Sequence, residues 1–322
     1  MAALEEILLA KQENRHELTL SGHNYQHMFK DDKNMSLFDI QSLNFLEISK
    51  TGIDRLPKEI GKLKDLAKLA LYQNSLTELP NSISELENLK FLDLSRNNIA
   101  ILPDLSSLVV LESLNVSFNA LEAMPNIEHL VRLHVLDFSN NQIRAFPDGV
   151  SCEELVVLAT INAANNEIHQ VPEELHNLTS LKVLNVSNNK LNSLPDDLVS
   201  CPKLRNLLLT GNSFKDRKLQ RLTNDHNDHA KHVLDYLRKT SKQPKKDSKS
   251  KNAKKQSSKR QQVKEKVQDA MKILQFKDGL TVQVSPRVGD VRPYIVCCIA
   301  RKINFSQTEN LYKKFITAQV TL

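Results

Sequence analysis

The stretch LKFLDLSRNNIAILP, at residues 89–103, decides the fold of this chain because close copies of it recur along the sequence. The copy before it reads LAKLALYQNSLTELP at residues 66–80, and the copy after it reads LESLNVSFNALEAMP at residues 111–125. A period of about 20 to 50 residues indicates a repeat architecture. Eight units share the pattern L-x-x-L-x-L-x-x-N-x-L-x-x-L-P in whole or in part, starting at residues 43, 66, 89, 111, 133, 158, 181 and 204.

Two further residue types keep step with the leucines of this pattern. The Asn position is filled, at spacings of 22 to 25 residues, by Asn74, Asn97, Asn119, Asn141, Asn166, Asn189 and Asn212. Seven of the eleven prolines occupy the last position, namely Pro57, Pro80, Pro103, Pro125, Pro147, Pro172 and Pro195. One unit cannot bury its own apolar face, so stacked units must share a continuous core with protected ends. We expect the Asn side chains to bond backbone groups that this core would otherwise leave unpaired.

The pattern resembles the intracellular class of leucine-rich repeats, whose units are about 22 or 23 residues long. This resemblance covers residues 43–214 and implies an α/β fold, a horseshoe-shaped solenoid of about eight repeats. We expect residues 1–42 to form an N-terminal cap, and the apolar Leu18 and Leu20 leave open that it includes one degenerate repeat unit. Apolar residues near helical spacing predict a C-terminal capping helix over residues 215–237.

Side chains on a strand alternate, so the residues between the inward leucines face the concave side, which is the usual binding surface of a solenoid. Exposed aromatic residues beside charges are typical of interface anchors. We expect a protein partner to contact Phe45, Tyr72, Phe91, Asp93, Arg96, Phe118, Val135 and Asp137. For Asp93 and Asp137 an alternative stays open, because L-D-[LF]-S is a common form of the repeat and these carboxylates could serve its geometry or solubility.

Charge divides the chain into segments. Residues 1–237 hold 23 Lys and Arg against 32 Asp and Glu, whereas residues 238–260 hold 11 against 1. The basic segment has no periodic apolar residues, which predicts a disordered linker over residues 238–262. Its alternative roles are a solvated spacer, a nuclear localisation signal, or contact with RNA phosphates. In the last case the RNA-binding residues would be Lys245, Lys246, Lys254, Lys255, Lys259 and Arg260.

Beyond the linker, an amphipathic helical pattern and two apolar strand patterns predict a second folded segment over residues 263–322. The stretch DVRPYIVCCIARKINFSQTENLYKKFITAQVTL resembles the opening of the B3/B4 domain of the phenylalanyl-tRNA synthetase beta subunit, notably at Val291, Arg292, Pro293 and Tyr294. Repeats followed by such a domain resemble the leucine-rich repeat-containing protein 47 family. The resemblance implies a partial α+β B3/B4-like segment and association with RNA, as tRNA or on the ribosome. Because the sequence stops at Leu322, soon after this opening, we expect the editing pocket to be incomplete.

Composition excludes several function classes. The chain has 4 Cys in irregular positions and 7 Gly, and it shows no paired-cysteine zinc motif, nucleotide-binding loop or catalytic constellation. We therefore expect no enzyme activity, no cofactor, no metal and no small-molecule substrate. No apolar run approaches the roughly 20 residues of a spanning helix, so we expect no membrane association and a cytoplasmic location, with the nucleus as the alternative.

The sequence thus predicts a non-catalytic interaction scaffold that binds a protein through its concave face. We expect the basic linker and the B3/B4-like tail to add contact with RNA or the translation machinery. One alternative is an inactive remnant of a tRNA synthetase beta subunit or tRNA-editing protein. Another is a repeat scaffold that regulates phosphatases or GTPases.

Overall fold

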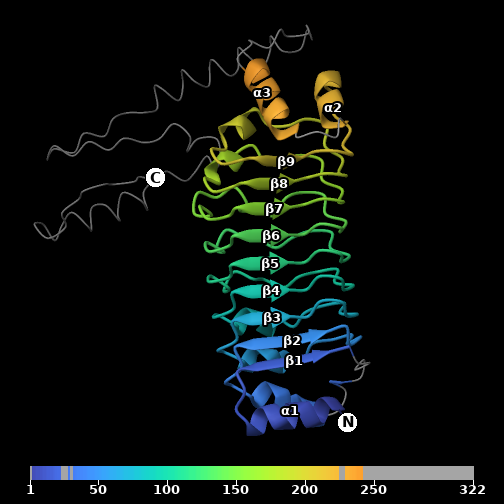
Figure 1. Ribbon diagram of the computed structural model, residues 1–322, viewed down its shortest axis with the longest axis vertical. Coiled ribbons are helices and arrows are strands. Elements are labelled where there is room, and N and C mark those ends of the chain that lie inside the picture. Colours follow the sequence, from blue (N-terminus) through green and yellow to red (C-terminus); the bar gives the residue numbers. More distant parts are fainter. Residues whose placement is uncertain (1, 23–27, 30–31, 225–228, 242–322) are drawn as a thin grey trace, which may run out of the picture. The chain divides into compact units, whose positions relative to one another are not determined.

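The computed structural model describes residues 2–22, 28–29, 32–224 and 229–241. Within these residues nine strands form one parallel sheet in chain order, and Figure 1 shows them stacked one above the next. The strands are β1 (Glu17–Ser21), β2 (Phe45–Ser49), β3 (Lys68–Ala70), β4 (Phe91–Asp93), β5 (Ser113–Asn115), β6 (Val135–Asp137), β7 (Thr160–Asn162), β8 (Val183–Asn185) and β9 (Asn206–Leu208). Strands β2–β9 correspond to the eight predicted units, and the solenoid is confirmed.

Every strand from β2 onward pairs with the next at the same position of the repeat. Leu69 of β3 lies opposite Leu92 of β4, which lies opposite Leu114 of β5. These middle residues are buried, while Phe91 and Asp93 on either side of Leu92 are exposed and half-buried. The expected alternation of a strand with one buried face is therefore present. We call the solvent side of the sheet, lined by the residues that flank the buried middle positions, the sheet face.

The side of the solenoid opposite the sheet is built from turns and short 3-10 helices. Those within the repeats are η2 (Lys58–Lys62), η3 (Asn81–Glu85), η4 (Leu175–Asn177) and η5 (Asp196–Ser200). Pro57, Pro80 and Pro195 immediately precede η2, η3 and η5 with φ between −65° and −69°, the value that the proline ring imposes. The apolar residues that follow, such as Ile60 and Ile83, are fully buried and join the leucines of the strands in one core.

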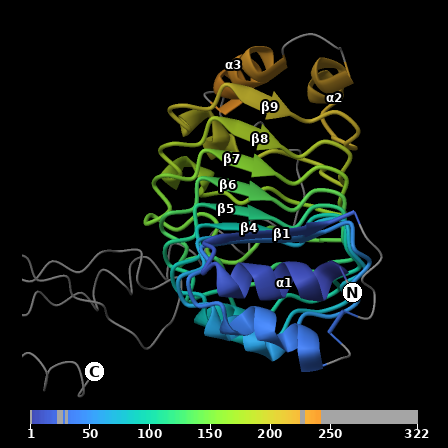
Figure 2. The same ribbon diagram turned by 60° about the horizontal axis from the view of Figure 1, so that its bottom comes forward.

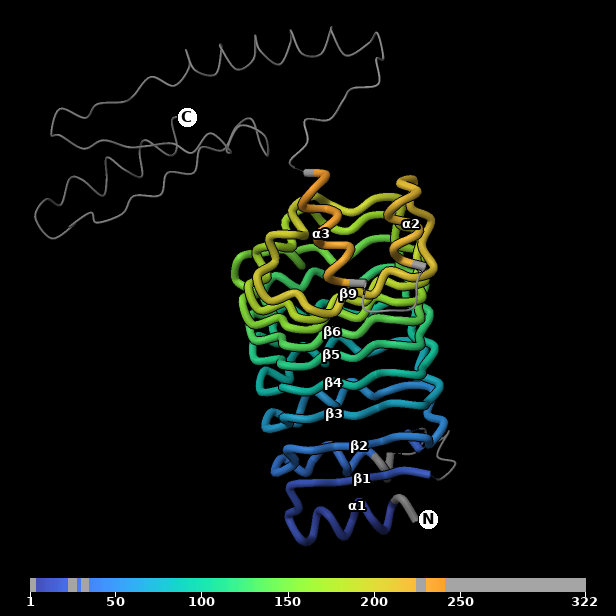
Figure 3. Tube along the Cα trace, turned by 45° about the horizontal axis from the view of Figure 1, so that its top comes forward, coloured from blue at the N-terminus to red at the C-terminus, as the bar shows by residue number. Residues whose placement is uncertain are grey.

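The asparagine side chains connect neighbouring turns of the solenoid, which Figure 3 shows as coils lying one on another. Asn97 donates from Nδ2 to the carbonyl oxygens of Leu71 and Leu94, both at 2.9 Å. Its Oδ1 accepts the backbone N–H of Leu76 at 3.1 Å. Where Thr51 replaces Asn, its N–H and hydroxyl donate to Oδ1 of Asn74 in the next unit, at 3.0 and 2.8 Å. Buried polar groups are thereby satisfied, as the sequence predicted.

Helices cover both ends of the sheet (Figure 2). Helix α1 (Ala2–Gln12) lies next to β1 and buries Ile7 and Ala10, and 3-10 helix η1 (Asp32–Asp39) packs against it. At the other end lie α2 (Arg217–Asn224) and α3 (His229–Ser241). Each end of the apolar core is therefore shielded from water.

Three expected boundaries differ from the structure. The sheet begins at Glu17, inside the segment expected as the cap, because Leu18 and Leu20 are buried and continue the core without an Asn in the repeat position. Two helices, not one, follow the last repeat. Helix α3 extends to Ser241, so residues 238–241 of the expected disordered linker are helical.

The rest of the basic segment and the B3/B4-like segment at residues 263–322 lie outside the described residues, as do Lys245, Lys246, Lys254, Lys255, Lys259 and Arg260. Among the helices that the structure does describe, none combines the length and apolar character needed to cross a lipid bilayer.

Candidate protein-binding face

The first residue of each strand contributes to a column across the sheet face. From β2 to β6 this column consists of Phe45, Lys68, Phe91, Ser113 and Val135. Phe91 and Val135 are 42% and 39% exposed, respectively. Phe45 is half-buried, and the ammonium nitrogen of Lys68 lies 4.8 Å from the centroid of its ring. The column therefore presents apolar surface from three strands beside one cation.

A second column lies just beyond the strands, at the residue before each Asn position, where the backbone φ is positive. Its members are Lys50, Gln73, Arg96, Phe118, Asn140, Asn165 and Asn188, with φ between 54° and 58°, and Gly211, with φ of 74°. This left-handed conformation is unfavourable for residues with a Cβ atom and is tolerated best by Gly and Asn. Phe118 nevertheless occupies it, and its ring is 44% exposed. The strain at Phe118 is not accompanied by full burial of its side chain.

Cations of the second column lie over aromatic rings. The guanidinium carbon of Arg96 is 4.4 Å from the ring centroid of Phe118, and the ammonium nitrogen of Lys50 is 5.9 Å from that of Tyr72. Contacts of this kind contribute about 0.5–1 kcal/mol at exposed sites. Tyr72 is half-buried, and its hydroxyl donates to Oε1 of Glu47 at 2.9 Å. Tyr72 is thus fixed at both its ring and its hydroxyl.

The two aspartates of the expected site are bonded to the repeat itself. Oδ1 of Asp93 accepts the backbone N–H of Ser95 at 2.9 Å. Oδ1 of Asp137 accepts the N–H and the hydroxyl of Ser139, at 3.0 and 2.7 Å, while its Oδ2 accepts the amide of Asn162 at 2.9 Å. These contacts favour the alternative in which Asp93 and Asp137 serve the geometry of the repeat.

The eight expected residues all lie on the strands β2, β4 and β6 or in the turns that directly follow strands of the sheet: Phe45, Tyr72, Phe91, Asp93, Arg96, Phe118, Val135 and Asp137. Lys68 and Lys50 were absent from that set, although both lie over aromatic members of it. For Lys50 a sequence signal exists, since it directly precedes the Asn position of its unit. Its place over Tyr72 depends on the neighbouring unit, which the local pattern does not show.

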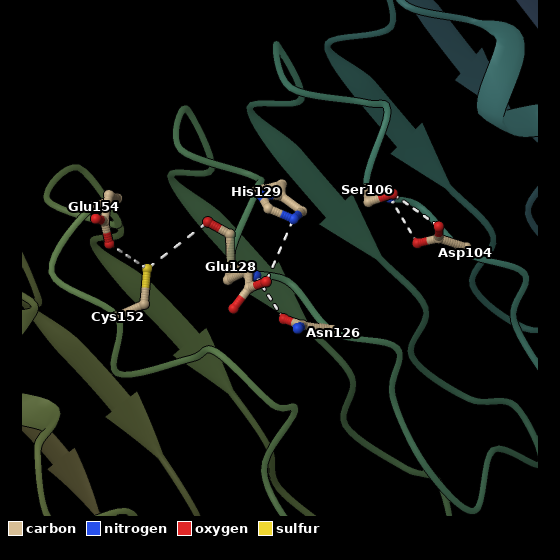
Figure 4. A network of polar contacts seen from close by, with 7 residues as sticks. All are labelled: Asp104, Ser106, Asn126, Glu128, His129, Cys152 and Glu154. Atoms are coloured by element: carbon tan, nitrogen blue, oxygen red, sulfur yellow. Dashed lines mark hydrogen bonds and ion pairs between the residues drawn. The ribbon is translucent and has the colours of Figure 1, made fainter. Parts of the chain in front are cut away.

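A polar network on the turns that follow the repeat prolines is the other candidate site (Figure 4). Ser106 donates its N–H and hydroxyl to Asp104, at 2.9 and 2.8 Å. The N–H of Glu128 donates to Asn126 at 2.9 Å, and the Glu128 carboxylate lies 3.3 Å from Nε2 of His129. Bonds between a side chain and the backbone two residues later stabilise turns. Most of this network is therefore accounted for by turn structure.

The surroundings of both cysteine thiols in the described residues oppose ionisation. Cys152 donates to Oε2 of Glu154 at 2.9 Å, and burial together with this hydrogen bond raises the pKa of its thiol. Burial raises the pKa of Cys201 to about 11. Because the thiolate is the nucleophile, neither side chain is activated at neutral pH. No group of three or more His, Cys, Asp or Glu suited to a metal ion occurs among the described residues.

Comparison with known proteins leads to the same architecture. Residues 18–146 match the family model described as a leucine-rich repeat region, and residues 156–214 match a leucine rich repeat model. These residues form a leucine-rich-repeat solenoid. The first match begins at Leu18, so it includes strand β1 of the array.

Solved structures share this solenoid. A leucine-rich-repeat protein of Leptospira interrogans is 27% identical with a TM-score of 0.57, over 67% of this chain and 60% of that one. An internalin of Listeria monocytogenes is 24% identical with a TM-score of 0.57, over 68% and 62%. A TDR receptor is 28% identical with a TM-score of 0.51, over 56% and 32%. The chain thus spans less than two thirds of the length of each, and no curated protein sequence matches it.

Proposed function

We propose that this chain is a non-catalytic interaction scaffold whose sheet face over β2–β6 binds a protein partner. The observation that carries the proposal is Phe118, a large aromatic residue 44% exposed at φ 55°. Each unit has this backbone conformation at the same position, and the next two units fill it with Asn140 and Asn165, a residue type that it accepts more readily. Backbone strain is a frequent feature of binding sites, and exposed aromatics anchor interfaces.

The surroundings of Phe118 support the same proposal. Phe91 and Val135 extend the exposed apolar surface across the neighbouring strands, and Arg96 lies over the Phe118 ring. An apolar centre with a guanidinium beside it is typical of the residues that dominate binding energy in protein interfaces. Leucine-rich-repeat proteins generally act through protein–protein interaction, and the fold is typically a non-enzymatic scaffold.

The double variant Phe91→Ala with Phe118→Asn tests this proposal. Asn suits the left-handed backbone, so the variant should keep the circular dichroism spectrum of the parent. The matched control is Val109→Ala with Val131→Ala, which removes exposed apolar side chains from the turns before β5 and β6. Affinity capture from cells with quantitative mass spectrometry should show proteins retained by the parent and the control and lost from the double variant. Equal retention by all three chains would contradict the proposal.

RNA or ribosome contact through residues 238–322 is the second candidate function. It is supported by the excess of 11 Lys and Arg over 1 acidic residue at residues 238–260, and by the resemblance of the tail to a B3/B4 domain of the leucine-rich repeat-containing protein 47 family. In this proposal Lys245, Lys246, Lys254, Lys255, Lys259 and Arg260 contact phosphates, the synthetase-like tail is inactive, and the protein acts in the cytoplasm.

Salt dependence tests the RNA proposal. Phosphate contacts release counterions, so the affinity of the full chain for a fluorescent single-stranded RNA should fall steeply as salt rises. A chain ending at residue 241 should lose this binding. RNA binding that survives the truncation would exclude the basic segment as the site.

A further inference from the structure

We infer that the segment bound by the sheet face is an acidic, extended peptide of the partner protein, an inference that rests on the proposed function. Three exposed cations carry it: Lys50, Lys68 and Arg96. Each lies over an aromatic ring, and none of them forms an ion pair with a carboxylate of the described residues. Their N–H donors are thus held in place but left available to an anion from another molecule.

Other cations of the solenoid show the contrast. Lys64 lies 2.7 Å from the Glu85 carboxylate, and Lys190 lies 3.1 Å from that of Glu167. Because residues 1–237 hold 32 acidic side chains against 23 basic ones, carboxylate partners are abundant on this chain. Arg55, Lys58 and Arg132 also form no ion pair in the described residues, but they lie over no aromatic ring. Lys50, Lys68 and Arg96 do so in adjacent units and together form a local site that attracts carboxylates.

Two carboxylates of the same sheet face, Glu47 and Asp93, accept hydrogen bonds within the solenoid. Glu47 is half-buried and accepts the hydroxyls of Tyr72 and Ser49 at 2.9 and 2.7 Å. Asp93 is half-buried and accepts the N–H of Ser95. Part of the hydrogen-bonding capacity of both carboxylates is therefore used within the solenoid, whereas the three cations are exposed and pair with no carboxylate of the described residues. Charge complementarity then favours an acidic partner.

The remaining sheet face suits the main chain of a peptide. In the second column beyond Phe118, the Asn165 amide donates to Oδ1 of Asn140 at 3.0 Å, and the Asn188 amide donates to Oδ1 of Asn165 at 2.8 Å. Amides both donate and accept, as the peptide backbone does. Adjacent strands are about 4.8 Å apart, so β2 to β4 spans roughly 10 Å, the length of about three extended residues. We therefore expect the bound peptide to place two or three of its carboxylates over β2–β4. One apolar side chain of the peptide would then contact Phe91 and Phe118.

RNA fits this face less well than an acidic peptide. A nucleic acid carries a charge on every phosphate and would extend over the acidic units that follow, where residues 133–180 hold seven Asp and Glu against one Arg. A peptide can confine its negative charge to the few residues that meet the three cations.

A charge-matched pair of variants tests the inference in the full chain. The first variant carries Lys50→Gln, Lys68→Gln and Arg96→Gln; Gln73 already occupies the left-handed column at φ 58°, so Gln fits there. The control carries Arg55→Gln, Lys58→Gln and Arg132→Gln, which removes the same charge from exposed residues outside the strands and the left-handed column. Both should keep the thermal unfolding midpoint of the parent within a few degrees.

The probe is a displayed library of random 12-residue peptides, selected on the immobilised full chain. We expect enriched peptides to combine Asp or Glu with one large apolar residue. A synthetic enriched peptide should bind the sheet-face variant at least tenfold more weakly than the parent in fluorescence anisotropy, and the control unchanged. A copy with phosphoserine in place of its acidic residues should bind no more tightly.

Other results of the peptide selection would contradict either the acidic partner or the proposed function. If the enriched peptides are neutral or basic, the inference of an acidic partner is wrong. The same holds if acidic peptides bind the sheet-face variant as tightly as the parent. If the phosphoserine copy binds more tightly than its parent peptide, the group that the cations bind is a phosphate and not a carboxylate. If such peptides still require Phe91 and Phe118, the proposed function survives. Failure to enrich any peptide, or binding independent of those two rings, overturns both. A 12-nucleotide RNA that loses affinity only for the sheet-face variant would assign the cations to RNA.

Discussion

Single asparagine side chains stabilise the solenoid at the residue scale. Asn97 is buried and joins its own turn to the turn before it through Leu71, Leu76 and Leu94. An unpaired buried polar group costs about 1–3 kcal/mol, so one side chain here protects several backbone groups at once. Its neighbour Asn98 is exposed and provides a built-in comparison.

Asn97→Ala should lower the free energy of unfolding by about 3 kcal/mol or more, because the Leu76 N–H and two carbonyl groups lose their partner. Asn98→Ala should change it by less than about 0.5 kcal/mol, as surface substitutions usually do. Urea unfolding followed by circular dichroism measures both. Similar losses at the two positions would show that the buried Asn is not a specific support.

Phe118→Asn should leave stability almost unchanged, in contrast to a buried phenylalanine. Relief of left-handed strain, about 1 kcal/mol, offsets loss of the Arg96 contact, about 0.5–1 kcal/mol. Phe138→Ala, at a fully buried ring, should cost about 3–5 kcal/mol in the same urea titration. A comparable loss for Phe118→Asn would identify Phe118 as a core residue and weaken its role in binding.

At the scale of elements, the repeat strands could be predicted because each copy contains its own leucines, Asn and Pro. For strand β1 the sequence indicated only an optional degenerate unit, since Leu18 and Leu20 alone mark it and its stability depends on pairing with β2. The alternation of inward and outward side chains along a strand also predicted that Phe91 and Val135 are exposed. Arg96 was in the expected site, whereas Lys50 and Lys68 were left out of it because their places over Tyr72 and Phe45 depend on side chains of the neighbouring unit.

The left-handed turn after β9 makes a prediction for glycine. A Cβ atom at Gly211, where φ is 74°, would meet Oδ1 of Asn188 at 2.0 Å and displace this side-chain amide, whose Nδ2 donates to Oδ1 of Asn165. Gly211→Ala should therefore cost more than Gly22→Ala, where φ is also 74° but nothing lies within 4 Å. Thermal unfolding compares the two, and Asn188→Ala added to Gly211→Ala should recover part of the loss. Equal costs would exclude the contact as the cause.

The two C-terminal helices make a pH prediction. Tyr236 of α3 donates to Asp216, which caps the start of α2, and this hydrogen bond together with burial raises the pKa of Tyr236 from 10.0 to about 12. A raised pKa means that the folded chain holds the proton longer, so this stability is present below pH 10 and is lost as pH rises toward 12. The stability difference between the parent and Tyr236→Phe should be constant from pH 7 to 9 and shrink by pH 11. A constant difference up to pH 11 would contradict the raised pKa.

At the scale of the whole molecule, the chain joins an acidic repeat array to a basic segment, and the central question is which of them holds a protein partner. We assign this role to the sheet face, with Phe91 near its centre and Val131 outside it. A photoreactive benzoylphenylalanine placed at either residue of the full chain reports on its immediate neighbours.

Photo-crosslinking in cells from these two positions, with and without RNase and read by mass spectrometry, tests the claim most directly. We expect specific protein adducts from position 91 that persist after RNase and are absent from position 131. Position 91 giving no protein adducts, or only adducts that RNase abolishes, would contradict it and move the function to the basic segment.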